Sequence, residues 1–238
     1  MSDLTGDAEK LRQIKIALRV RLLTARQSLS GTARAAAAAE LQTQILSLVR
    51  ETRPTRIAAY VPIGAEPGGP DLPYRLAEAL PTGGRLLLPV LLPDNDLDWA
   101  EFTGVLSPAS RGLLEPTGPR QGPAALRTAD LVLVPALAVA LDGTRMGRGG
   151  GSYDRALARL DGDGPHAAAP SRNGPPIAAT LGKGPHTAHP GEGPSIVALL
   201  HDGEDVDVVP AEPHDRHVHA VITPTGGFSP RPAPNDRV

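Results

Sequence analysis

Apolar residues recur along this chain in two spacings, one typical of helices and one typical of buried strands. Between residues 8 and 29 they fall on one stripe at intervals of three, four or seven, which predicts an amphipathic helix. The stripe consists of Leu11, Ile14, Leu18, Leu22 and Leu29. Lys15 and Arg19 lie four residues apart and therefore share another face of the same helix.

Short apolar runs farther along the chain alternate with helical patterns. The runs predict strands at 56–61, 85–92, 130–135, 195–200 and 218–223. Helices are expected at 32–50, 71–80 and 152–160, and Ser30 and Asp71 precede the first two as N-cap residues. This alternation indicates an α/β sheet with helices on both faces, in which sites gather at the carboxyl ends of the strands.

Composition narrows the class of protein. The 238 residues suit one domain with appendages, and 40% apolar content provides a core that is poor in aromatics. The net charge of −2 provides no general attraction to nucleic acid or to an anionic membrane. The absence of cysteine excludes disulfides, cysteine–zinc sites and cysteine nucleophiles. Without an apolar run near 18 residues or a signal peptide, we expect a cytoplasmic protein.

Three segments lack any periodic pattern. Residues 161–194 contain seven glycines and seven prolines, and they have too few apolar residues to offset the entropy of ordering. Their histidines have no helix or hairpin to fix them, so metal binding there is disfavoured. Residues 107–127 are expected to form a long surface loop. The Pro-rich tail at 225–238 is expected to be disordered.

The glycine-rich stretch from Arg145 to Asp154 carries the strongest chemical signal. Glycines at 147 and 149–151 leave backbone N–H groups unobstructed, and a helix beginning at Ser152 adds its own free N–H groups. With Arg145 and Arg148, these parts predict an anion site, and phosphate is the anion most often bound in this way. An acid beside phosphates is repulsive unless a cation lies between them, so Asp154 is a candidate magnesium ligand.

Other interpretations of this stretch are weaker. A tight turn with solvated arginines remains possible, although a turn requires fewer glycines. No Gly-Lys-Ser/Thr follows, so the stretch is not a Walker A loop. It also lacks the third small residue and the adjoining strand of a dinucleotide-binding fingerprint.

The motif Arg145-Met-Gly-Arg-Gly-Gly-Gly-Ser-Tyr-Asp154 resembles the signature of the 5-formyltetrahydrofolate cyclo-ligase family, Arg-Leu-Gly-x-Gly-x-Gly-Tyr-Tyr-Asp. Met146 and Ser152 depart from it, and Ser152 removes an aromatic ring. The resemblance implies one domain over residues 1–238, with 161–194 as an insertion. It also implies a monomer with a three-layer, Rossmann-like sheet, of the type found in sugar-phosphate isomerases and CoA-transferases.

The resemblance also implies site residues. Lys15 and Arg19 match the family's Lys-x-x-x-Arg pair, and Lys15 and Arg148 are the candidate catalytic residues. The ATP-binding residues would be Lys15, Arg19, Arg145, Met146, Gly147, Arg148, Gly149, Gly150, Gly151, Ser152 and Tyr153. The folate-binding residues would be Val61, Glu66, Arg148, Gly149, Gly150, Gly151 and Ser152. Magnesium would be bound by Asp154 and Asp215.

By this resemblance the protein would use ATP and Mg²⁺ to cyclise 5-formyltetrahydrofolate to 5,10-methenyltetrahydrofolate, releasing ADP and phosphate. Its partners would be these small molecules, with no nucleic acid and no membrane. Two alternatives remain. One is a nucleotide- or folate-binding protein with impaired catalysis. The other is an enzyme of the same sheet superfamily that acts on a phosphorylated or CoA-linked substrate.

Overall fold

The computed structural model of the chain describes residues 3–160, 193–212 and 215–232. Its helices are α1 (Asp3–Ser28), α2 (Gly31–Thr52), α3 (Leu72–Ala79) and α4 (Ser152–Ala158), with 3-10 turns η1 (Ser110–Gly112) and η2 (Pro123–Thr128). The first six strands are β1 (Arg56–Ala58), β2 (Arg85–Leu91), β3 (Leu97–Glu101), β4 (Leu106–Pro108), β5 (Leu114–Pro116) and β6 (Leu131–Pro135). The others are β7 (Ala138–Ala140), β8 (Arg145–Met146), β9 (Ser195–Leu199), β10 (Asp205–Val206), β11 (Ala220–Thr223) and β12 (Gly227–Pro230).

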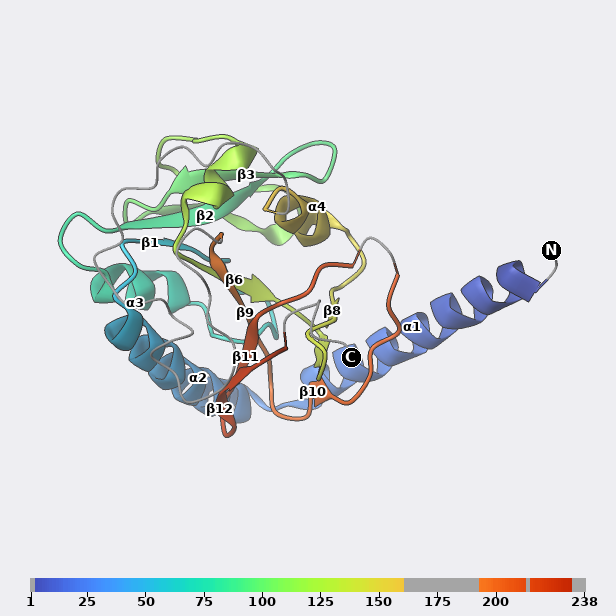
Figure 1. Cartoon of the computed structure of the whole chain (residues 1–238). Coiled ribbons are helices and arrows are strands. Elements are labelled where there is room, and N and C mark those ends of the chain that lie inside the picture. Colours follow the sequence, from blue (N-terminus) through green and yellow to red (C-terminus); the bar gives the residue numbers. More distant parts are fainter. Residues whose placement is uncertain (1–2, 161–192, 213–214, 233–238) are drawn as a thin grey trace.

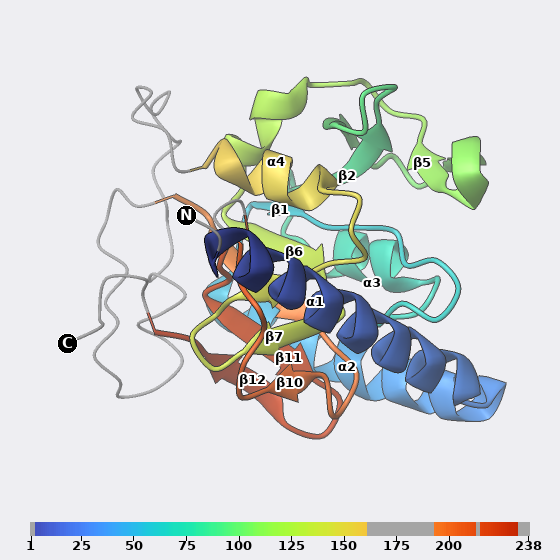
Figure 2. The same cartoon turned by 90° about the vertical axis from the view of Figure 1, so that its right-hand side faces the viewer.

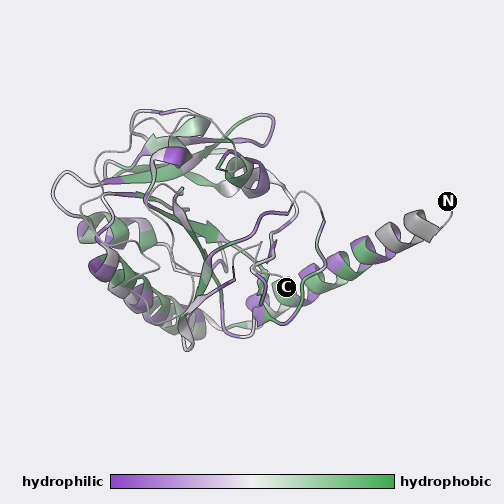
Figure 3. Ribbon diagram, in the orientation of Figure 1, coloured by the Kyte–Doolittle hydropathy of each residue, from purple (hydrophilic) through white to green (hydrophobic). Residues whose placement is uncertain are grey.

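Within the described residues, the main sheet has seven strands in the order β12-β11-β9-β6-β1-β2-β3. The neighbours from β11 to β2 pair in parallel, whereas β3 and β12 pair antiparallel at the two edges. The parallel strands are buried on both faces, which explains why their sequences are continuous apolar runs. Figure 3 shows this apolar character along the strands inside the molecule.

Helices cover both faces of the sheet, as predicted. One core cluster joins α2 and α3 to one face through residues such as Ile45 and Leu76. The other cluster packs η2 and α4 on the opposite face, around the fully buried Trp99. Figure 1 shows the sheet between these layers. The three-layer α/β expectation is therefore confirmed.

Local signals placed the helices well. The Ser30 hydroxyl accepts a hydrogen bond from Ala33 N at 3.1 Å, as an N-cap should. Asp71 precedes α3, but its side chain makes no capping bond and instead accepts from Gln42. The position of α3 was thus predicted correctly, but its capping contact was not.

Two expectations about irregular segments were wrong. The segment 107–127 forms β5, η1 and η2, and β5 pairs with β4 as a hairpin. In the expected tail, Gly227–Pro230 pairs with β11 and Arg231 is buried, because the edge of the sheet offers backbone partners that composition cannot reveal. The expected insertion at 161–194 lies outside the described residues except at its last two positions, as does the tail beyond residue 232. Among the described residues, no helix is both long and apolar enough to cross a membrane.

Candidate active site

The main cleft lies at the point in the sheet where the connections from two neighbouring strands, β1 and β6, run in opposite directions. From β1 the chain continues outward to β2, whereas from β6 it continues to β9 on the other side. Connections that diverge in this way leave a crevice at the carboxyl ends of β1 and β6. A cleft of about 680 Å³ opens there, and Tyr60 and Val61 after β1 and Pro135 and Ala136 at the end of β6 line it.

Helix α1 presents a cationic face to this cleft, and Lys15 and Arg19 belong to it, on the face that the sequence separated from the apolar stripe. Part of that apolar stripe is exposed. The side chains of Leu11 and Ile14 are 42% and 47% exposed, whereas Lys15 and Arg26 are buried. Figure 1 shows why: the N-terminal half of α1 extends beyond the sheet, so it has no core to pack against on its apolar side. Figure 2 looks onto α1, with α4 and β5 above it.

Lys15 is held between two carboxylates. Its Nζ donates to Glu212 Oε2 and to Asp215 Oδ2, each at 2.6 Å, and its side chain is only 2% exposed. Glu212 N also donates to Asp215 Oδ2 at 2.7 Å, which fixes the two acids relative to each other. A buried ammonium requires such partners, because an uncompensated charge is costly away from water.

The glycine-rich loop lies beside α1. Arg19 Nε donates to Gly147 O at 3.1 Å, so the predicted pair on α1 reaches both the acids and the loop. Gly149 and Gly151 have φ angles of +100° and +71°, which strain any other residue. A Cβ at Gly151 would also lie 2.9 Å from Arg155 Nη1. Helix α4 then begins at Ser152, as predicted.

Arg145 and Met146 are placed differently from what a phosphate-binding role suggests. They form β8, which pairs with β7, so a hairpin separates the loop from β6. Met146 is fully buried, its carbonyl accepts from Leu137 N, and it does not belong to the lining of the cleft. Arg145 is 2% exposed and its Nη2 donates to Asp154 Oδ1, the predicted magnesium ligand.

Glu66 and Arg148 meet across the cleft, as expected for residues that follow neighbouring strands. Arg148 Nη1 lies 3.2 Å from Glu66 Oε1, and Ile63 N donates to Glu66 Oε2 at 3.0 Å. The Arg148 side chain is 54% exposed, whereas that of Glu66 is 11% exposed. The arginine can therefore leave this pair for another anion more readily than the carboxylate can move.

Two tyrosines stand beside Glu66. Burial and the nearby Glu66 charge raise the pKa of Tyr60 well above its usual value, and Tyr60 Oη donates to Pro67 O at 2.7 Å. Burial also raises the pKa of Tyr153. Tyr153 lines the cleft, and its hydroxyl is buried without a hydrogen-bond partner within the described part of the chain. Both phenols therefore stay protonated.

One wall of the cleft was not predicted from the sequence. We call it the apolar wall, and it consists of Pro89, Leu91, Leu97, Leu113 and Leu114. The hairpin β4–β5 supplies the last two, within the segment that was expected to be a surface loop. We call another part of the lining the charged wall, and it consists of Lys15, Arg19, the 147–154 segment, Glu212 and Asp215. Glu212 was not predicted either, although its position three residues before Asp215 indicates that the two acids can lie close together.

The candidate magnesium ligands face the same cleft but do not form a complete site by themselves. Asp154 is paired with Arg145, and Asp215 with Lys15. Among residues 3–160, 193–212 and 215–232, no group of three or more His, Cys, Asp or Glu side chains could hold a metal ion. Two carboxylates nevertheless suit Mg²⁺ when substrate phosphates complete its coordination.

Comparison with known proteins agrees with this geometry. Residues 11–182 match the model of the 5-formyltetrahydrofolate cyclo-ligase family. The chain is 35% identical over 220 residues to a 5-formyltetrahydrofolate cyclo-ligase of Mycolicibacterium smegmatis, covering 90% of this chain and 95% of that one. The Aquifex aeolicus 5,10-methenyltetrahydrofolate synthetase structure has a TM-score of 0.65 at 22% identity, covering 94% and 95% of the two chains. The Mycoplasma pneumoniae synthetase structure has a TM-score of 0.58 at 18% identity, covering 88% and 98%. This chain therefore belongs to the 5-formyltetrahydrofolate cyclo-ligase family.

Proposed function

We propose that the protein uses ATP to cyclise 5-formyltetrahydrofolate to 5,10-methenyltetrahydrofolate, with release of ADP and phosphate. One observation carries the proposal beyond family membership. A single cleft brings together the charged wall, the apolar wall and the carboxylate of Glu66. Phosphates, a flat ring system and an amino-pyrimidine edge are the parts of the two substrates that require such partners.

The reduced folate would lie between Glu66 and the apolar wall. A carboxylate accepts two parallel hydrogen bonds from an amino-pyrimidine edge, and Ile63 N already orients one of its oxygens. Arg148 would then give up or share its contact with Glu66 and turn its charge toward the phosphates. Val61 is almost completely buried and would supply only a small part of the contact surface.

ATP would lie along the charged wall. Backbone N–H groups of residues 147–152 suit phosphate oxygens, and Lys15, Arg19 and Arg148 add positive charge. Helix α4 has seven residues, so its dipole contributes less than these side chains do. We propose that Asp154 and Asp215 bind Mg²⁺ together with the phosphates. The ion would neutralise charge on the phosphates and orient them.

The chemistry proceeds in two steps. The formyl oxygen on N5 attacks the γ-phosphorus, the bond from that phosphorus to the β–γ bridging oxygen breaks, and ADP leaves. N10 then attacks the activated formyl carbon, loses its proton, and the C–O bond breaks to release phosphate. Positioning and charge neutralisation dominate such transfers, so the protein requires no nucleophile of its own. Lys15 and Arg148 would stabilise charge on the transferred group.

The test is the formation of methenyltetrahydrofolate, followed by absorbance, with 5-formyltetrahydrofolate and Mg-ATP supplied together or separately. We expect product and ADP in equal amounts only when both substrates are present. Binding of both substrates without turnover would indicate a binding protein, and absence of folate binding would favour another enzyme of this sheet superfamily.

A further inference from the structure

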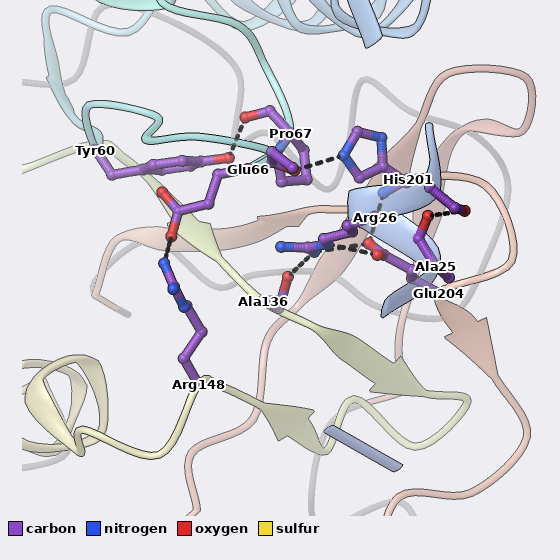
Figure 4. Close-up of polar contacts among 11 residues, drawn as sticks. Ala25, Arg26, Tyr60, Glu66, Pro67, Ala136, Arg148, His201 and Glu204 are labelled. Carbon is purple, nitrogen blue, oxygen red and sulfur yellow. Dashed lines mark hydrogen bonds and ion pairs between the residues drawn. The ribbon is translucent and has the colours of Figure 1, made fainter. Parts of the chain in front are cut away.

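A buried ion pair lies beneath the cleft, away from the phosphate-binding loop. Arg26 of α1 donates from Nε to Glu204 Oε1 at 2.6 Å and from Nη2 to Glu204 Oε2 at 2.8 Å. Arg26 Nη2 also donates to Ala136 O at 2.5 Å, and both side chains are at most 5% exposed. Buried pairs persist where such additional hydrogen bonds satisfy them. Figure 4 shows the pair between α1 and the ends of β6 and β9.

His201 extends this contact to the loop that bears Glu66. The Glu204 carboxylate accepts a third hydrogen bond, at Oε2 from His201 N at 2.7 Å. The ring Nε2 of His201 lies 3.0 Å from Ala65 O, and His201 is 8% exposed. A carbonyl can only accept, so we assign the proton to Nε2. The contacts thus run from α1 through Glu204 and His201 to the residue that precedes Glu66 (Figure 4).

Two cavities adjoin the Glu66 loop. Ile63, Glu66 and Arg148 line the main cleft of about 680 Å³ and also a second cavity of about 420 Å³. Gly64 and Ala65 line only the second cavity. Packing therefore supports the loop weakly, and its position depends on hydrogen bonds.

We propose that His201 is a positioning residue for the folate site: its Nε2–H holds the Ala65 carbonyl and thereby sets the place of the Glu66 carboxylate. Glu204 fixes His201 to α1, which carries Lys15 and Arg19, so one set of contacts aligns the folate carboxylate with the ATP-binding helix. This inference rests on the proposed function, in which Glu66 recognises the pterin. His201 itself does not touch substrate.

The test separates positioning from general stability by comparing two replacements. His201→Leu fills similar space but removes the donor, and we expect the folate KM to rise about tenfold while the ATP KM stays within about twofold. His201→Gln places an amide N–H near the position of Nε2 and should restore most of the folate KM. His219→Leu is the matched control, because His219 Nδ1 accepts from Ile196 N at the opposite end of the sheet. It should leave both KM values unchanged.

A folded His201→Leu protein with a normal folate KM would overturn the inference, as would a Gln variant no better than Leu. If His201→Leu fails to fold, His201→Gln and the shorter His201→Asn make the same comparison, with only Gln expected to retain the folate KM. Inactivity of the unaltered protein with both substrates would instead refute the proposed function.

Discussion

The two walls of the cleft differ in whether their side chains already have partners in the absence of a ligand. On the charged wall the buried Lys15 is already paired with Glu212 and Asp215, and Asp154 is paired with the buried Arg145. On the apolar wall Leu114 is 40% exposed, so much of its surface can still be covered by a ligand. Buried charges require compensation before a ligand arrives, whereas apolar side chains lose little by facing water.

The difference has a consequence for binding. In the proposed function, phosphates that approach Lys15 would compete with two carboxylates, so ATP binding would exchange one set of ion pairs for another. A divalent cation bound by the displaced acids would make this exchange favourable. The apolar wall requires no exchange, and its contribution should follow the area that the folate covers. The two walls should therefore respond differently to substitution.

The largest effect is expected on the charged wall, at Lys15. Lys15→Met removes a charge from the phosphates and leaves Glu212 and Asp215 without their ammonium partner. We expect turnover to fall by roughly 10²–10³-fold, the usual cost of losing a preorganised charge contact. Steady-state kinetics measure this, and Lys10→Met, on the exposed surface of α1, is the control. Near-normal turnover in Lys15→Met would remove Lys15 from the mechanism.

Asp154→Asn is expected to have the second largest effect on turnover. If Asp154 binds magnesium, turnover should fall on the order of 10²-fold and the magnesium needed for half-maximal rate should rise. A melt alone cannot decide the role, because the change also leaves the buried Arg145 charge uncompensated and lowers stability. The decisive measurement is a magnesium titration of turnover at a temperature where the variant is folded. An unshifted titration would exclude the ligand role.

Glu66 lies between the two walls and should affect one substrate selectively. Glu66→Gln turns one acceptor into a donor that faces the pterin N–H groups, so the folate KM should rise roughly 10–100-fold. The ATP KM should change much less. The comparison variant is Glu78→Gln, on the exposed face of α3. Equal effects on both KM values would show that Glu66 does not recognise the folate.

Substitution in the apolar wall should have a smaller effect. Leu113→Ala removes apolar contact area and should raise the folate KM by about fivefold, equivalent to about 1 kcal/mol. The ATP KM and the magnesium dependence should stay normal. Val105→Ala, near the same hairpin but not in the cleft, serves as the control. A matching rise in Val105→Ala would point to hairpin stability rather than folate contact.

The smallest effect on activity is expected from a substitution in the Asp96–Arg159 ion pair, which links the turn before β3 to the end of α4. Asp96, in the turn before β3, pairs with Arg159 after α4. Burial is the largest single effect and would raise the pKa of Asp96. The hydrogen bonds from Arg159 and Leu97 N, together with the charges of Arg159 and Arg155, outweigh it and lower the pKa. A carboxyl with a lowered folded-state pKa stabilises the fold above its unfolded pKa, and this contribution is lost as pH falls through the folded value.

Asp96→Asn should therefore lower stability by about 1 kcal/mol at pH 7, with little change in turnover at low temperature. The difference from the unaltered protein should shrink as pH falls below about 3.9. Urea melts across this range, beside the exposed control Asp207→Asn, measure it. A constant difference at all pH values would mean that the Asp96 charge does not contribute.

The sequence predicted the charged wall well and the apolar wall not at all. The motif at 145–154 combines residues close in the chain, and Lys15 and Arg19 share a helical turn, so local geometry and resemblance sufficed. Leu113 and Leu114 are not part of a periodic apolar pattern. They reach the cleft only because the β4–β5 hairpin folds over β2 and β3, which the local sequence does not indicate. Glu212 was missed because its role depends on Lys15, almost 200 residues away.

The sequence by itself determined the helices, the parallel strands of the main sheet and the class of fold, because runs of apolar residues and caps such as Ser30 act locally. It also determined the glycine loop, since positive φ at Gly149 and Gly151 is a property of those residues. Tertiary structure alone decided which charges meet. It buried Lys15 and Arg26 on α1 while exposing Leu11 and Ile14, because the partners of the cations, Glu204, Glu212 and Asp215, come from the far end of the chain. Pairing energy depends on distance and burial in space, and spacing along one helix cannot encode either.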